Sequence, residues 1–303
     1  MPFFSIIIPT FNRDVLVIRA IDSVIAQTCD DWELIVIDDA STDNTAEYLD
    51  RYSQNSKIIV IRNGVNLERS VSRNIGIERS NGSYICFLDS DDYYLESHLQ
   101  ELYDLIQIQG EPVAFFYATV LQEVDGVRKI LPVSIDPKNP VESVILRNIP
   151  PTGVCIHKDI LSRERFPVGM NVNEDVYLFA RIVAQYPFFG HQFPTVVWVM
   201  HGGNTNKQFR DYLGPQIEAS KVVFGDPVIQ PFLSDAFKND RYHGLYSALV
   251  HQHIESFPKA LQFLRKAWAF KPGLKNNKGA IGNILYHLPF GVMLRKLKRV
   301  LGS

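Results

Sequence analysis

Short apolar runs alternate with helix-length amphipathic segments through the first 110 residues of the chain. The apolar runs are too short for buried helices and are predicted to be strands, at residues 3–8, 34–37, 57–61 and 84–88. Between them lie segments with helical periodicity, at residues 18–28, 42–52, 70–79 and 96–108. This βαβ order predicts an α/β fold with a mainly parallel sheet that is flanked by helices.

The order of elements changes after Pro112. The dipeptide Asp125-Gly126 between two apolar segments indicates a hairpin. The later predicted elements are hairpin strands at 113–121 and 127–131, a helix at 174–185, a strand at 195–200, and helices at 212–223, 241–256, 258–270 and from 279. We therefore expect an α/β domain over residues 1–207 and a helical C-terminal region over residues 208–303.

The cysteines and the apolar segments limit the class of protein. The three cysteines, Cys29, Cys86 and Cys155, lie far apart and form no C-x-x-C pair. This spacing argues against a disulfide framework and a structural zinc site, and it suits a reducing compartment. Because neither a signal peptide nor a run of 18 apolar residues is present, we expect a cytoplasmic protein.

Charge is distributed unevenly along the chain, although the net charge is only −2. Residues 1–255 carry 21 basic and 33 acidic side chains, whereas the remainder carries ten basic side chains and no acidic ones. Near the end, apolar residues from 281 onward share one helical face and basic residues gather at 295–299. This basic tail either packs on the body with its charges in water, or lies as a peripheral helix on an anionic membrane surface. No nucleic-acid partner is expected.

Acidic residues gather in three predicted loops. Asp38 and Asp39 follow the second strand, residues 89–92 (DSDD) follow the fourth, and Glu174 and Asp175 begin a later helix. Helix capping explains one or two acids at a helix start, but not three acids in four residues. Because like charges repel, such a cluster favours a bound cation. Carboxylate oxygens suit Mg²⁺ or Mn²⁺, which also takes phosphate oxygens, so a diphosphate ligand is indicated.

The loop after the first strand, residues 9–12 (PTFN), matches neither a dinucleotide fingerprint nor a P-loop. Together with three later segments it resembles the successive motifs of the family 2 inverting glycosyltransferases, at residues 5–13, 36–43, 72–77 and 82–92. The resemblance covers roughly residues 3–205. It implies a GT-A fold, a nucleotide-sugar donor that is most often UDP-linked, a Mn or Mg divalent cation, and inversion at the anomeric carbon. It also suggests a saccharide or lipid-linked saccharide acceptor in cell-surface polysaccharide assembly.

The resemblance assigns residues to the donor. Pro9 and Thr10 would line the nucleotide base, and Asp39 would accept a hydrogen bond from a uracil ring N–H. Arg73 would neutralise donor charge, although a surface arginine on a helix is the plain alternative. One departure is Glu68, which stands where the family often has a small residue, so the sugar that fits is left open.

The resemblance also assigns the metal and the base. Asp89 and Asp91 form the family's D-x-D motif, with Asp91 the first candidate for the metal and Asp92 able to share it. Asp175 matches the general base, which must remove the acceptor's hydroxyl proton; the alternative is an acid that favours the helix dipole. His201 resembles a histidine that lies late in the sequence of many GT-A enzymes and contacts the metal or the diphosphate. The alternative is a purely structural histidine. The candidate residues are Pro9, Thr10, Asp39, Arg73, Asp89, Asp91, Asp92, Glu174, Asp175 and His201.

Other classes of protein remain as alternatives. A nucleotidyltransferase would need a Gly- and Arg-rich loop where residues 9–12 lie. A two-carboxylate hydrolase would leave the metal cluster without a role. A non-catalytic nucleotide-sugar-binding or scaffold protein of the same fold predicts loss of the base or the metal acids, and both Asp91 and Asp175 are present.

Overall fold

The structure is a computed structural model of the chain, and it describes residues 1–147, 149–201 and 212–286. The chain divides into two compact units. The first consists of Met1–Phe209 with Pro227–Phe232, and the second of Arg210–Asp226 with Leu233–Ser303. The predicted boundary after residue 207 lies outside the described residues.

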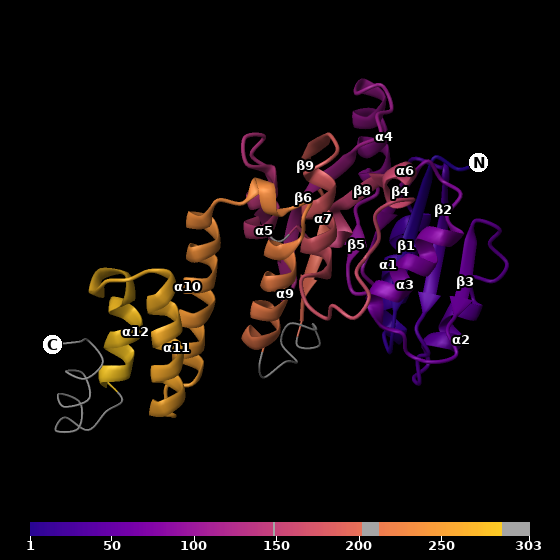
Figure 1. Cartoon of the computed structure of the whole chain (residues 1–303). Coiled ribbons are helices and arrows are strands. Elements are labelled where there is room, and N and C mark those ends of the chain that lie inside the picture. Colours follow the sequence, from indigo (N-terminus) through magenta and orange to yellow (C-terminus); the bar gives the residue numbers. More distant parts are fainter. Residues whose placement is uncertain (148, 202–211, 287–303) are drawn as a thin grey trace. The chain divides into compact units, whose positions relative to one another are not determined.

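The first unit begins with the predicted parallel strands. They are β1 (Phe4–Thr10), β2 (Trp32–Asp38), β3 (Ile58–Arg62) and β4 (Tyr84–Phe87), in the sheet order β3-β2-β1-β4. The helices that connect them are α1 (Asp14–Ile25), α2 (Thr45–Asp50) and α3 (Glu68–Arg79). Figure 1 shows β1, β2 and β3 side by side in one layer. The predicted α/β fold is confirmed, and the parallel register brings the carboxyl ends of these strands to one edge.

The rest of the sheet is mixed, so "mainly parallel" describes only its first half. β8 (Val154–His157) pairs antiparallel with both β4 and β6 (Phe115–Val124), and β9 (Phe188–Met200) pairs parallel with β6. The remaining elements of this half are β5 (Tyr93–Tyr94), α4 (His98–Ile108), β7 (Val127–Leu131), α5 (Pro140–Arg147), α6 (Lys158–Leu161) and α7 (Glu174–Val183). The predicted hairpin at Asp125-Gly126 is confirmed as the β6–β7 turn, with positive φ at both residues.

Strand β1 continues through Pro9, where we predicted it to end. The pairing of β1 with β4 stops at Ile7, whereas its pairing with β2 continues to Thr10. The carbonyl of Ile7 accepts from β4 and that of Thr10 accepts from the β2 side, so Pro9 faces the side where β4 has ended. Proline has no N–H to donate, and here no ladder bond is lost.

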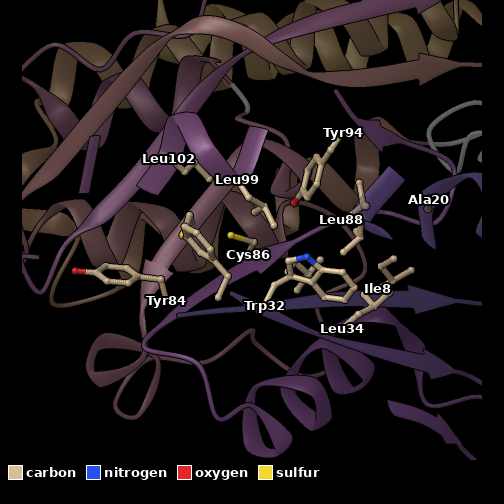
Figure 2. Close-up of a cluster of buried hydrophobic side chains, with 14 of the residues drawn as sticks. Ile8, Ala20, Trp32, Leu34, Tyr84, Cys86, Leu88, Tyr94, Leu99 and Leu102 are labelled. Atoms are coloured by element: carbon tan, nitrogen blue, oxygen red, sulfur yellow. The ribbon is translucent and has the colours of Figure 1, made fainter. Parts of the chain in front are cut away.

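The core of the first unit lies between the sheet and helices α1 and α4. Helix α1 contributes its buried face of Val17, Ala20, Ile21 and Val24, which pack against strand residues such as Ile8 and Leu34. Figure 2 shows 14 side chains of this cluster, among them Tyr94, Leu88 and Leu99. The cluster therefore includes residues on both sides of the acidic loop after β4, and its burial fixes where that loop starts and ends.

The second unit is helical within the described residues, as predicted. Its helices are α9 (Leu213–Gly225), α10 (Asp235–Gln252), α11 (Phe257–Phe270) and α12 (Leu274–Tyr286). Val250, Ala260, Leu264, Ala280 and Ile284 form the core of α10, α11 and α12. Residues 287–303, which hold the predicted basic cluster, lie outside the described residues. Among the helices that are described, none is both long and apolar enough to cross a bilayer.

Candidate active site

Strained backbone concentrates where the chemistry was predicted. Six non-glycine residues of the described chain have positive φ, and four of them lie in the predicted site loops. These four are Asn12 after β1, Ala40 after β2, Glu68 at the start of α3, and Asn173 before α7, with φ between 51° and 69°. Left-handed backbone at such residues costs free energy, and it clusters at functional sites.

The loops after β1 and β2 are joined by side chains. The Asn12 backbone N–H donates to Ser41 Oγ at 2.9 Å, and the Thr42 N–H donates to Asn12 Oδ1 at 2.8 Å. Asp39 is 4% exposed, and its Oδ1 accepts from Asn63 Nδ2 at 2.7 Å and from the Leu67 N–H at 2.9 Å. These two bonds orient the carboxylate and leave its second oxygen to face another donor.

Thr10 and Pro9 lie beside Asp39. The Asp39 N–H donates to the Thr10 carbonyl at 2.9 Å, which places the two predicted base-lining residues next to the predicted uracil acceptor. Thr10 is 3% exposed, and its hydroxyl has no hydrogen-bond partner within the described residues. A buried hydroxyl without a partner is costly, so this atom is suited to a ligand or water that completes its bonding.

Arg73 on α3 joins the other predicted loops. Its Nη2 lies 2.6 Å from Asp89 Oδ1, after β4, and its Nη1 lies 3.2 Å from Glu174 Oε1, at the start of α7. Arg69, one turn earlier, places its Nε 2.7 Å from the same Glu174 oxygen. Arg73 is 2% exposed, and its guanidinium holds two loops together; the contact with donor charge stays a prediction. Glu174, also buried, is likewise engaged by the two arginines.

Replacing Arg73 by Met is expected to lower the free energy of unfolding by about 3 kcal/mol, because the buried Glu174 and the Asp89 carboxylate lose a charged partner. Urea denaturation of both proteins measures this loss. The matched control is Arg62→Met, which removes the exposed ion pair with Asp50 and is expected to cost less than about 1 kcal/mol. Similar losses in both variants would contradict the organising role of Arg73.

Asp91 and His201 come together although 110 residues separate them. His201 Nε2 lies 3.0 Å from Asp91 Oδ2, and Arg13 Nη2 lies 3.7 Å from the same oxygen. Because the Asp91 carboxylate and the His201 imidazole lie side by side, together they offer an oxygen and a nitrogen ligand to a divalent cation. Within the described residues no group of three or more His, Cys, Asp or Glu side chains suits a metal, so a cation here would take its other ligands from water and phosphate.

Asp92 occupies a different environment from Asp91. It is 1% exposed, and its Oδ1 accepts from the Val199 N–H of β9 at 2.9 Å. Burial, and then the carboxylates of Asp89 and Asp91, raise the pKa of Asp92 well above its ordinary value. The bond to Val199 ties the acidic loop to β9, and the metal-sharing role of Asp92 stays a prediction.

Asp175 lies in the first turn of α7, next to Glu174, and is half-buried. Burial of its carboxyl group, and secondarily the Glu174 carboxylate, raise its pKa to about 7. The Val176 N–H and the guanidinium groups of Arg73 and Arg69 oppose this shift. A carboxylate that titrates near neutral pH is matched to proton transfer, which is what a general base requires.

Proteins similar in sequence to this chain point to one family. The family model described as "Glycosyl transferase family 2" matches residues 5–148. The putative colanic acid biosynthesis glycosyl transferase WcaA of Escherichia coli is 32% identical over 211 residues, which cover 66% of this chain and 74% of WcaA. The chain belongs to glycosyl transferase family 2.

Two further matches are a curated relative and a solved structure. The UDP-Glc:alpha-D-GlcNAc-diphosphoundecaprenol beta-1,3-glucosyltransferase WfaP of Escherichia coli is 32% identical over 127 residues, 42% of this chain and 49% of WfaP. The crystal structure of S. aureus TarS 1-349 in complex with UDP-GlcNAc superposes with a TM-score of 0.62 at 17% identity, covering 99% of this chain and 83% of that chain. The TarS likeness supports the GT-A fold. The chain spans less than half the length of the first curated relatives that it matches.

Some residues around the candidate site could not be predicted from the sequence. Arg13 lies within the first motif and Arg69 shortly before the third, but an arginine on a helix or loop gives no sign of its partner. Thr152, in the 3-10 turn Pro151–Gly153, is fully buried and its Oγ1 accepts from the Asp89 N–H at 3.2 Å. Only the three-dimensional pairing of β4 with β8 brings Thr152 to this loop.

Glu68, the departure from the family pattern, has a left-handed backbone conformation. Its φ of 69° is a conformation that glycine adopts without strain, and its side chain is exposed. We expect Glu68→Gly to change the free energy of unfolding by no more than about 1 kcal/mol, because relief of strain offsets the entropy that glycine adds to the unfolded chain. Urea denaturation of Glu68→Gly beside Glu68→Ala measures this; a Gly variant less stable than the Ala variant would contradict it.

Proposed function

We propose that the chain is a metal-dependent inverting glycosyltransferase that moves a sugar from a UDP-linked donor to a hydroxyl acceptor. The observation that carries the proposal is the position of Arg73, whose guanidinium contacts both Asp89 in the acidic loop and Glu174 at the start of α7. The buried guanidinium of Arg73 thus holds the proposed donor loop beside the helix that carries the proposed base. Membership of family 2 supports the same assignment.

The donor base is proposed to lie at the ends of β1 and β2. Asp39 Oδ1 is held by Asn63 Nδ2 and the Leu67 N–H. The second oxygen of the Asp39 carboxylate therefore accepts the hydrogen bond from the ring N–H of uracil. The Thr10 hydroxyl, buried without a partner among the described residues, completes the contact. The names of WfaP and of the TarS complex mention UDP-linked sugars, which supports UDP as the nucleotide here.

The residues at the acidic loop fit a divalent cation. Asp91 Oδ2 and His201 Nε2 lie 3.0 Å apart and would hold Mn²⁺ or Mg²⁺ between them and the diphosphate. Such a cation, when bound, acts as a Lewis acid that offsets the charge growing on the departing diphosphate. Arg13, 3.7 Å from the same carboxylate, adds positive charge on that side of the loop. Asp89, fixed by Arg73, orients the loop that presents Asp91.

Asp175 is proposed to act on the acceptor. Its carboxylate takes the proton from the acceptor hydroxyl as the oxygen attacks the anomeric carbon on the face opposite the leaving diphosphate, and this direct displacement inverts the configuration. A pKa of about 7 makes the ionised form available near neutral pH. Glu174 stays paired with Arg69 and Arg73, and so keeps the first turn of α7 in place.

The process is proposed to be cell-surface polysaccharide or glycolipid assembly. WcaA is named for colanic acid biosynthesis and WfaP for a diphosphoundecaprenol-linked acceptor, which supports a saccharide or lipid-linked saccharide acceptor for this chain. A peripheral position at the inner face of the membrane would suit such an acceptor. The basic residues of the tail that prompted this idea lie outside the described residues.

The test is a donor panel followed by product analysis. Purified protein is incubated with UDP- and GDP-linked sugars and Mn²⁺, and free nucleotide is measured with and without a saccharide or lipid-linked acceptor. We expect UDP release from one UDP-linked sugar, and proton NMR of the first product should show the anomeric configuration opposite to that of the donor. Retention of configuration would refute the inverting mechanism. Binding of UDP with no transfer to any acceptor would favour the non-catalytic alternative.

A further inference from the structure

The segment that follows the acidic loop is held by one polar stripe of the first helix. Arg19 and Ser23 lie four residues apart on α1, and Gln27 follows at the same spacing just after the helix ends. Side chains at this spacing lie on one face. Each of the three contacts the main chain between residues 91 and 99, and we define them together as the α1 stripe.

The contacts of the α1 stripe run in register along that segment. Arg19 Nη2 donates to the Asp91 carbonyl at 2.6 Å, and the Tyr94 N–H donates to Ser23 Oγ at 3.2 Å. Gln27 makes two bonds, from Nε2 to the Leu95 carbonyl and from the Leu99 N–H to Oε1, both 2.8 Å. Main-chain groups accept and donate here whatever side chains they carry, so the stripe sets the position of the backbone itself.

Arg19 differs from the other two because it contacts Asp91 itself, the residue whose carboxylate meets His201. The Arg19 guanidinium carbon lies 4.7 Å from the centre of the Tyr93 ring. The Tyr93 hydroxyl donates to Glu123 Oε2 at 2.8 Å and accepts from Arg128 Nη2 at 2.6 Å. These two residues of the β6–β7 hairpin hold the Tyr93 ring in place. Arg19 is therefore held between a fixed ring and one carbonyl.

The bonding of Arg19 argues against a role in stability alone. Its Nε is buried and has no hydrogen-bond partner within the described part of the chain. A buried donor without a partner costs free energy, so an apolar side chain of similar length would suit folding about as well. What an apolar side chain cannot supply is the bond to the Asp91 carbonyl.

We infer that Arg19 is a positioning residue that sets the Asp91 main chain, and through it the carboxylate that meets the divalent cation. The inference rests on the proposed function. Groups that orient metal ligands without touching the metal typically change metal affinity by 10- to 100-fold when they are removed. The α1 stripe thus couples the first helix, and through Tyr93 the β6–β7 hairpin, to the geometry of the metal site.

The first test is a Mn²⁺ titration in the presence of UDP, with free Mn²⁺ measured by electron paramagnetic resonance. We expect Arg19→Met to raise the half-saturating Mn²⁺ concentration about tenfold. Arg19→Lys, which keeps the charge and a donor, is expected to recover part of that affinity and serves as the second variant if Arg19→Met does not fold. The matched control is Tyr52→Phe, which removes the 2.8 Å bond to Asp22 of α1 but none of the contacts of the α1 stripe, and it should leave Mn²⁺ affinity unchanged.

The second test uses no metal. Hydrogen exchange of a peptide that covers residues 91–99 should be faster in Arg19→Met than in the wild type, and unchanged in Tyr52→Phe. Unchanged exchange together with unchanged Mn²⁺ affinity in Arg19→Met would overturn the inference. A wild-type protein that binds no Mn²⁺ with UDP would instead overturn the proposed metal site, and the exchange result alone would then decide whether Arg19 sets this backbone.

Discussion

Asp91→Asn is expected to lower the rate of sugar transfer by about 10²- to 10³-fold while the fold stays intact. The amide removes one negative charge and one strong ligand from the point where Asp91 Oδ2 meets His201 Nε2. A Lewis-acid contribution of several kcal/mol to the barrier corresponds to a loss of this size. The residue lies in a loop and not in the core, so the melting temperature should remain close to that of the wild type.

The control for Asp91→Asn is Asp104→Asn, an exposed residue of α4 that accepts from Gln100 Nε2 at 2.9 Å. It makes the same chemical change outside the acidic loop and should retain full activity. The measurement is the initial rate of UDP release at saturating donor over a Mn²⁺ series. Full activity in Asp91→Asn at every Mn²⁺ concentration would contradict the proposal that Asp91 binds the divalent cation.

Asp175→Asn is expected to lower turnover by about 10²- to 10⁴-fold and to leave donor affinity near the wild-type value. An amide cannot take the acceptor's proton, and general-base catalysis contributes about this much. Calorimetric titration with UDP and a turnover assay separate the two effects. Asp159→Asn, which changes the first-turn acid of α6 instead, is the matched control. If donor affinity collapsed in Asp175→Asn, the residue would belong to the donor site and another base would be needed.

The pKa of Asp175 also predicts two pH dependences. In the wild type the rate should rise with pH through about 7, because only the ionised carboxylate accepts a proton. For stability the sign is opposite: the folded protein holds this proton up to about pH 7, whereas the unfolded chain releases it near pH 4. Ionisation therefore costs folding stability as pH rises between those values. Asp175→Asn should be more stable than the wild type above pH 7, and this gain should vanish below about pH 4.

The parallel half of the fold and the positions of its loops could be predicted because their signals are local. An apolar run followed by a polar loop and an amphipathic helix is a βα unit, and carboxyl ends of parallel strands meet at one edge. β8 was missed because Val154–His157 is four residues long and has too few positions to show a period. The mixed half of the sheet depends on this strand, which joins β4 to β6.

The partners of the site residues could not be predicted for a different reason. Asp89, Asp91 and Asp92 are neighbours in sequence, yet one pairs with Arg73, one with His201, and one with the backbone of β9. These partners come from distant parts of the chain, so the roles of the three acids follow from tertiary packing and not from their spacing. The burial of Arg73 is the clearest case, because a helical arginine is ordinarily exposed.

The most direct test of the account is removal and return of the metal. Wild-type protein is treated with a chelator, and UDP release from the donor sugar is followed before and after Mn²⁺ is added back, with Asp91→Asn in parallel. We predict no release above background after chelation, recovery on addition of Mn²⁺ to the wild type, and no comparable recovery in Asp91→Asn. Full release in the chelated wild type would contradict metal-dependent transfer at Asp91 and His201.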